Sequence, residues 1–393
     1  MRGFPTQLLN EPSILNRTYW VYTMSLNSLK KLLLVSLLST LSIGTTSKPI
    51  TSPKAQYAEY TIRERATLDI KKTTVTDSQI IDWISIESQG NIAEPPPPLA
   101  PLTPDPTKET SRPLSELELP GVEIGPPGTV PVPRINLTYL AKAASKQLPR
   151  STPSTGQSKR QYSGDHWYVS SDQPVNNIGG SAVFSLFNAY VENPGDFSLL
   201  QTAVTRSTTN GLQTLEAGWI NYPNQVSQPH LFTYYTTNGY SAGGGWPSVD
   251  GGTQYEMQLG YQLSGGNWWL WVINRWVGYY PASLYSANQA NPSATLEAGS
   301  DTIYYYGEIY QSEGPLTTTD MGSGEFAGTG FGHAGYIHNM DYVDTNSTAQ
   351  YYTAGFGDSD SSRYNADPFP ESGTTWGSYT YLGGPGAGEV VGG

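Results

Sequence analysis

The chain has 393 residues, a formal net charge of −12 and no cysteine. Disulfides, thiol nucleophiles and cysteine-ligated zinc are therefore excluded. Residues 1–160 hold 18 Lys and Arg against 13 Asp and Glu, whereas residues 161–393 hold 3 against 20. The acidic part lacks the basic surface that phosphate backbones or anionic membranes attract, so we expect neither nucleic acid nor a membrane as its partner.

An apolar run lies near the N-terminus. Lys30 and Lys31 precede the apolar residues from Leu32 to Ile43, and small residues follow through Ser47. This order is typical of a secretory signal peptide, and the run is short for a membrane span. We therefore predict that residues 1–47 direct secretion and are then removed, with Met24 as a more usual start than Met1. An uncleaved membrane anchor is the alternative.

Residues 48–160 have the composition of a pro-segment. They include one amphipathic stretch, from Gln79 to Ile86, which is too short to form a core without a partner surface. Residues 94–135 are rich in proline, which favours extended polyproline II over packed structure and predicts a linker or strap. The Lys159-Arg160 pair would suit a processing protease, or it is simply part of a solvated linker.

Residues 161–393 consist of short apolar or aromatic runs separated by Gly, Asn and Ser, which is typical of an antiparallel β-sandwich or barrel. About ten strands would make one two-sheet domain. We predict strands at residues 166–170, 181–190, 213–220, 231–236, 255–263, 268–274, 276–279, 302–310, 334–340 and 349–354.

Two glutamates stand out in these strands. Side chains alternate between the two faces of a strand, so Leu215, Ala217 and Trp219 would enter the core while Glu216 and Gly218 share the other face. By the same alternation, Ile303, Tyr305, Gly307 and Ile309 point inward, and the opposite face holds Tyr304, Tyr306, Glu308 and Tyr310. A glycine beside Glu216 would leave room for a ligand. This pattern makes Glu216 and Glu308 candidate functional carboxylates.

Several short motifs occur together in a fixed order. They are Leu215–Trp219, Gly266–Leu270, Val277–Pro281, Gly307–Ile309, Met321–Gly324, Phe326 and Gly330–Gly332. In their order and approximate spacing they resemble the neprosin family of glutamic peptidases, over nearly all of residues 161–393. More faintly, residues 79–86 and 128–132 look like pieces of the activation segment of that family. Plant members carry cysteines that this chain lacks, so their disulfides do not transfer.

The resemblance implies an all-β fold, an antiparallel two-sheet sandwich of concanavalin-like or jelly-roll type. It also implies an endopeptidase that favours proline, with Glu216 and Glu308 as the catalytic pair. We expect substrate to contact Tyr304, Tyr306, Tyr310, Trp219 and Gly218, and we expect no cofactor and no metal. The expected partners are a peptide or protein substrate and the chain's own pro-segment as an inhibitor, and the expected state is a secreted monomer.

Paired carboxyl groups suit peptide hydrolysis, which needs a base for water and an acid for the leaving nitrogen. Close carboxyl groups resist simultaneous ionisation, so one keeps a proton while the other acts as a base, and we predict activity in acid. The pair would titrate as a unit, which leaves the individual roles open. The Tyr306 hydroxyl or a backbone amide would stabilise the oxyanion. A basic pro-segment on an acidic domain predicts a zymogen that acid activates.

Other functions remain as alternatives. A glycoside hydrolase also uses two carboxylates, and a carbohydrate-binding sandwich would use an aromatic cleft without chemistry. Residues 239–243 match the G-x-S-x-G pattern around Ser241, but glycines follow where the nucleophile elbow requires a helix. The four histidines, His166, His230, His333 and His338, form no known zinc motif.

Overall fold

A computed structural model of the chain describes residues 68–75, 80–100, 112–113, 125–134, 165–224, 229–236, 254–287 and 289–393. These residues belong to two compact units. The first unit contains the described residues 68–92 and 125–134, and the second contains the others. The predicted signal peptide, the Lys159-Arg160 pair and Ser241 lie outside the described residues.

The first unit is a three-stranded antiparallel sheet in the order β1 (Ile70–Val75), β2 (Ile80–Ser85) and β4 (Thr129–Pro133), with a short 3-10 helix η2 (Ile86–Gln89). Its buried side chains are Ile80, Trp83, Ile84 and Val130. The predicted amphipathic stretch is thus β2. The expectation of unpacked polyproline II is wrong for residues 129–133, because they pair with β2 and Val130 is buried against it.

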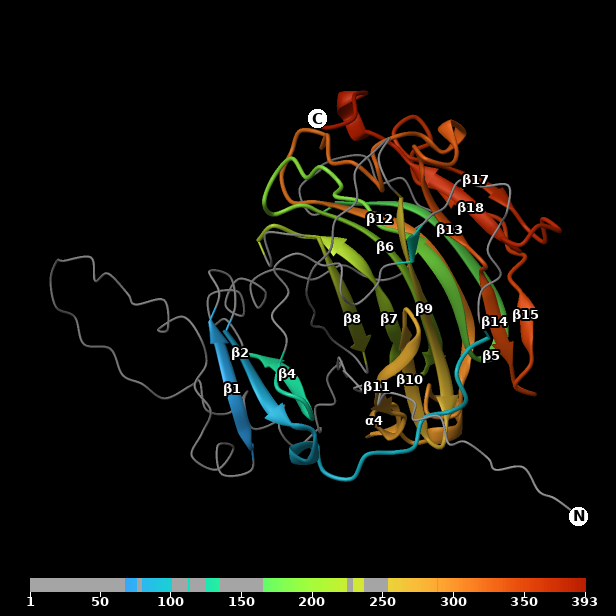
Figure 1. Ribbon diagram of the computed structural model, residues 1–393. Helices are drawn as coiled ribbons and strands as arrows, with labels where there is room; N and C mark the ends of the chain where they lie inside the picture. Colours follow the sequence, from blue (N-terminus) through green and yellow to red (C-terminus); the bar gives the residue numbers. More distant parts are fainter. Residues whose placement is uncertain are drawn as a thin grey trace, which may run out of the picture. The chain divides into compact units, whose positions relative to one another are not determined.

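The second unit is built almost entirely of strands (Figure 1). Its short helices are α4 (Ser283–Ser286), η3 (Pro292–Ala294), η4 (Ala327–Thr329) and η5 (Gly386–Gly388). The strands are β3 (Arg112–Pro113), β5 (Asp165–Ser185), β6 (Phe197–Thr208), β7 (Gly211–Asn221), β8 (His230–Thr236), β9 (Tyr255–Ser264), β10 (Asn267–Val272), β11 (Arg275–Pro281), β12 (Ser300–Gln311), β13 (Gly335–His338), β14 (Asp341–Asp344), β15 (Ala349–Tyr351), β16 (Gly357–Asp358), β17 (Asn365–Phe369) and β18 (Tyr379–Gly383). The predicted all-β fold is confirmed.

The main path of the sheet runs β11-β10-β9-β5-β12-β6-β7-β8. Strand β5 joins its two arms, because its first part pairs with β12 and its last part, from Gly179 to Ser185, pairs with β9. Gly179, at the change of partner, has φ 144°, and an added Cβ there would lie 2.1 Å from the carbonyl oxygen of Tyr261. Only glycine fits such a close approach, so the corner depends on it.

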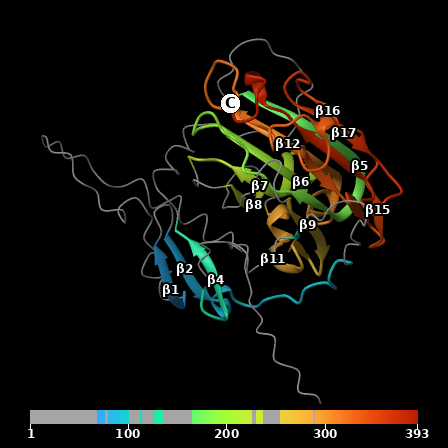
Figure 2. The same ribbon diagram turned by 45° about the horizontal axis from the view of Figure 1, so that its top comes forward.

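The two arms curl toward each other and enclose one large apolar core (Figures 1 and 2). Trp219 of β7 donates its indole hydrogen to the carbonyl of Ser185, and the Tyr261 hydroxyl of β9 donates to the carbonyl of Thr202 on β6. These bonds tie one arm to the other through the core. The arm containing β12, β6, β7 and β8 carries a second, smaller cluster of aromatic and apolar side chains on its opposite face.

Strand β6 was missed by the sequence-based prediction, which also extended one strand through residues 186–190, where the structure has none. Nearly every residue of β6 from Phe197 to Thr205 is buried on both faces, including Ser198, Gln201 and Thr202. Polar side chains buried among apolar ones hide the alternation from which a strand is recognised. The omission matters because β6 lies between the two strands that carry the candidate glutamates.

Candidate active site

Glu216 and Glu308 lie on the same face of the sheet. Glu216 of β7 pairs with Ala203 of β6, and Glu308 of β12 pairs with Leu199 of β6. Ala203 and Leu199 are an even number of residues apart, so their side chains and those of their cross-strand partners share one face. Both glutamates are nearly inaccessible, at 4% and 3% exposure. The predicted alternation is confirmed, but the carboxyl groups are buried among side chains.

Gln201 lies between the two glutamates. It is midway between Leu199 and Ala203 on β6, and it pairs with Tyr306 of β12 and Gly218 of β7. Its amide nitrogen donates a hydrogen bond to Glu216 Oε2 at 3.1 Å and another to the Tyr306 hydroxyl oxygen. The amide oxygen Oε1 is buried without a hydrogen-bond partner among the described residues. An unpaired buried acceptor of this kind is uncommon and suits a bound water or substrate N–H.

The strand register sets the separation of the two carboxyl groups. Glu216 and Glu308 are displaced by four residues along β6 and flank it on either side. On an ideal flat sheet that places their Cα atoms about 16 Å apart. Gln201, which donates to Glu216 Oε2 and to the Tyr306 hydroxyl, lies between them. That the two carboxyl groups share one proton stays a prediction.

Tyr306 is the central hydroxyl of the site. Its side chain is buried, and burial raises the pKa of its hydroxyl well above the usual value, with the nearby charges of Glu216 and Glu308 adding to the effect. Tyr306 thus keeps its proton throughout the pH range in which proteins are folded. Because the Gln201 amide donates to the phenolic oxygen, the phenolic hydrogen is directed to another acceptor. Tyr306 is therefore a hydrogen-bond donor whose pKa is raised further by both carboxyl groups.

His166 is a site residue that the sequence analysis missed. It lies on β5, and its Nδ1 is 2.6 Å from Glu308 Oε1. The ring packs on Tyr310, with centroids 4.8 Å apart, and on Tyr168 and Phe197 at longer range. These rings fix the imidazole against Glu308. A short contact between imidazole and carboxyl is a strong, charge-assisted hydrogen bond when the ring is protonated.

The remaining predicted substrate-contacting residues divide into two groups. Tyr304 and Tyr310 lie on the same face as the glutamates and are partly exposed, as a substrate contact requires. Trp219 is in the core on the opposite face, at 1% exposure, so its predicted substrate role is wrong. Gly218 is also reinterpreted: a Cβ there would lie 2.1 Å from the Leu200 carbonyl oxygen and 2.5 Å from Gln201 Cβ. The absence of a side chain at Gly218 makes room for Gln201 and not for a ligand.

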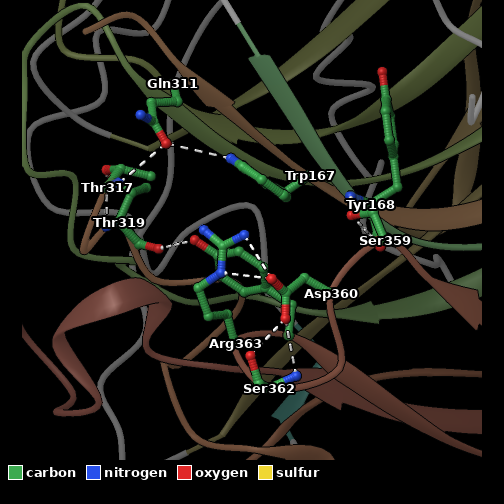
Figure 3. A network of polar contacts seen from close by, with 10 residues as sticks. Trp167, Tyr168, Gln311, Thr317, Thr319, Ser359, Asp360, Ser362 and Arg363 are labelled. Atoms are coloured by element: carbon green, nitrogen blue, oxygen red, sulfur yellow. Dashed lines mark hydrogen bonds and ion pairs between the residues drawn. The ribbon is translucent and has the colours of Figure 1, made fainter. Parts of the chain in front are cut away.

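A polar network holds the ends of β5 and β12 beside the site (Figure 3). Gln311, the last residue of β12, accepts hydrogen bonds from the Trp167 indole and from the Thr317 backbone N–H. The Arg363 guanidinium lies 3.7 Å from the centre of the Trp167 ring and pairs with Asp360 at 2.8 Å. Trp167 is therefore fixed from two sides. Because Trp167 is fixed, the position of the neighbouring residue His166 is also constrained, and the imidazole stays in contact with Glu308.

The described residues contain no group of three or more His, Cys, Asp or Glu side chains arranged to hold a metal ion. Within the same part of the chain, no helix combines the length and the apolar character needed to cross a membrane.

A sequence model of the Neprosin family matches residues 194–248 and 245–385. The chain carries a neprosin domain, and the resemblance inferred from its motifs is confirmed. This match supports a peptidase of glutamic type.

Solved structures with some likeness to this chain include an eqolisin-family peptidase, SCP-B, in complex with the tripeptide Ala-Ile-His. It is 8% identical, with a TM-score of 0.30, and the match covers 57% of this chain and all 100% of that one. A scytalido-glutamic peptidase bound to a transition-state analogue inhibitor is also 8% identical, with a TM-score of 0.31, over 56% of this chain and 98% of that one.

Proposed function

We propose that the chain is an acid-active endopeptidase in which Glu308 and Glu216 hydrolyse a peptide bond together. One observation carries the proposal: both carboxyl groups are buried on one sheet face, and Gln201, which donates to Glu216 and to Tyr306, lies between them. Burying a carboxyl group is costly unless it is paired or hydrogen-bonded, so two of them on one face are a candidate functional site. The family match supports peptide hydrolysis as the reaction.

Glu308 is the proposed base. The imidazole of His166, whose Nδ1 is 2.6 Å from Glu308 Oε1, orients the carboxyl group of Glu308 by hydrogen bonding. The carboxylate then takes a proton from a water molecule as the water oxygen attacks the carbonyl carbon of the substrate. A water held by the unpaired Oε1 of Gln201 would be oriented for that attack.

Tyr306 and Glu216 serve the other half of the reaction. The Tyr306 hydroxyl donates to the carbonyl oxygen as negative charge develops on it, and its raised pKa ensures that the donor hydrogen is present. Glu216, whose Oε2 accepts a hydrogen bond from the Gln201 amide, is the proposed acid. It protonates the leaving nitrogen as the C–N bond breaks. The proton taken by Glu308 then returns to Glu216 and restores the starting state.

Three further features belong to the proposal. The N-terminal region directs secretion, and residues 48–160 act as an inhibitory pro-segment. The formal charge of +5 on residues 1–160 against −17 on residues 161–393 favours their association near neutrality and weakens it as carboxylates protonate in acid. Proline next to the cleaved bond is the proposed preference, on the basis of the family alone.

A cleavage assay tests the function. The full-length chain is incubated in acid and then mixed with a proline-rich peptide or with soluble polysaccharides, and products are followed by mass spectrometry. We expect peptide fragments only, and we expect Glu308→Gln to abolish them. The matched control is Glu256→Gln, which changes another buried glutamate, bonded to His338 at 3.1 Å and paired with Ser185 at the opposite end of β5 from Tyr168, the partner of Glu308. Undiminished cleavage by Glu308→Gln would reject the proposal, as would sugar release in place of peptide fragments.

A further inference from the structure

A proline-rich stretch of the chain contacts the edge strand β11. Ala93 and Glu94 precede four consecutive prolines, Pro95 to Pro98. The backbone N–H of Ala93 donates to the Tyr279 hydroxyl at 3.2 Å, and the Trp276 indole donates to the Pro97 carbonyl at 3.1 Å. Most neighbouring residues of the stretch are exposed, but Pro96 is buried. The buried proline thus lies between the two hydrogen bonds that hold the backbone.

The two residues that contact this stretch, Trp276 and Tyr279, belong to a group of four aromatic side chains, which we call the β10–β11 aromatic cluster: Trp269, Trp271, Trp276 and Tyr279. Trp269 and Tyr279 have ring centroids 4.6 Å apart, and Trp271 meets Trp276 edge to face at 5.1 Å. The Trp271 indole donates to Gln258 within the domain, whereas the Trp276 indole donates to the proline carbonyl. The cluster thus combines ring faces with donor groups directed outward.

Polyproline II suits such a surface. It has no internal hydrogen bonds, so its carbonyl groups are available to outside donors, and its shape is already set before binding. Aromatic grooves that offer indole or phenol donors recognise proline-rich peptides in this way. Trp269 and Trp271 alternate with Trp268 and Leu270 of the core, so the cluster lies on the face of its arm that is turned away from the core. The glutamates lie on the outer face of the other arm, so the two sites are separate.

We propose that the β10–β11 aromatic cluster is a binding site for proline-rich peptides in the polyproline II conformation. In the uncleaved chain its occupant is the chain's own segment, residues 93–98. Once that segment leaves, the site accepts a proline-rich peptide from another molecule and retains it close to the protein. If the cluster selects substrates by binding them, that role rests on the proposed peptidase function. The binding of proline-rich peptides to the cluster does not depend on it.

The experiment measures peptide binding in a chain that cannot cleave. Full-length protein is made with Glu308→Gln, which prevents cleavage, and with Pro95→Ser, Pro96→Ser, Pro97→Ser and Pro98→Ser. The four serines are intended to release the chain's own segment from the aromatic cluster, and we call this variant the vacated chain. A fluorescein-labelled peptide that copies residues 91–100 is titrated in, and its anisotropy is recorded. We expect saturable binding, at least about tenfold tighter than to the chain that retains its prolines, because the chain's own segment competes for the site. A peptide with serine at the four proline positions should not bind.

Two conservative variants in the vacated chain locate the site. Trp276→Phe and Tyr279→Phe each keep a ring and remove one hydrogen-bond donor or acceptor, so each should weaken binding about three- to tenfold. Their melting temperatures report whether the fold is retained, and the second variant serves if the first unfolds. Equal affinity for the proline and serine peptides would overturn the proposal. So would unchanged affinity in both variants, or no binding to the vacated chain at millimolar peptide. Loss of catalysis by Glu308→Gln leaves these outcomes unaffected.

Discussion

Replacing His166 by Asn should impair catalysis much more than folding. The substitution removes an imidazole whose Nδ1 is 2.6 Å from Glu308 Oε1. A hydrogen bond of this kind to a charged group is worth about 1.5–3 kcal/mol. If that stabilisation supports the ionised form of Glu308 during the attack by water, its loss lowers kcat/KM about 10- to 100-fold. The loss should fall mainly on kcat, because His166 acts through Glu308 and not through substrate binding.

The assay compares His166→Asn with His338→Asn at pH values from 3 to 7 in the peptide cleavage reaction. His338 is the control, since its ring is likewise bonded to a carboxyl group, that of Glu256 at 3.1 Å, and it stacks on Trp376. Removing it should lower stability without lowering kcat/KM of the folded protein. Equal losses of kcat/KM in the two variants would refute the reasoning, because they would indicate a general effect of deleting a histidine that is bonded to a carboxyl group. A loss confined to KM would refute it as well.

Three further predictions concern the same unit. Tyr306→Phe should lower kcat about 100-fold with little change in KM, the effect of removing one oxyanion donor; a normal kcat would exclude that role. Gly218→Ala should lower the free energy of unfolding by about 1–3 kcal/mol and reduce activity by displacing Gln201, whereas Gly357→Ala, with open space around it, should do neither. Burial raises the pKa of Asp320 to about 7. The folded state therefore binds this proton more tightly than the unfolded chain, so stability should be greatest below about pH 4 and fall as pH rises to 7, by at most about 4 kcal/mol from this group. Asp320→Asn should flatten denaturant-measured stability between pH 4 and 8, and an unchanged slope would contradict the assignment.

The faces of the catalytic strands could be predicted from the sequence alone. The alternation of apolar and polar residues in β7 and β12 is local, and it correctly placed Glu216, Tyr306 and Glu308 on one face. The same alternation placed Trp219 in the core, and naming it as a substrate contact disregarded that pattern. Local periodicity thus predicted the face on which the two glutamates lie, but it does not indicate which strands are neighbours in the sheet.

The partners of the glutamates depend on pairing between distant strands. Gln201 lies in a strand whose polar residues are buried on both faces, so β6 has no visible alternation. His166 meets Glu308 only because β5 pairs with β12, 142 residues away in sequence. No motif or spacing in the sequence encodes that register. The contact of residues 93–97 with β11 was likewise unpredictable, since proline content indicates an extended chain but not the surface that it contacts.

A double-substitution cycle tests the central claim most directly. Cleavage of the proline-rich peptide is measured for the full-length chain, for Glu216→Gln, for Glu308→Gln and for the chain with both changes, each after the same acid incubation. Groups that act in one reaction step show strongly non-additive losses. We predict that the double variant is no slower than the slower single variant. Losses that multiply, or a single variant that cleaves normally, would contradict joint catalysis by the two glutamates.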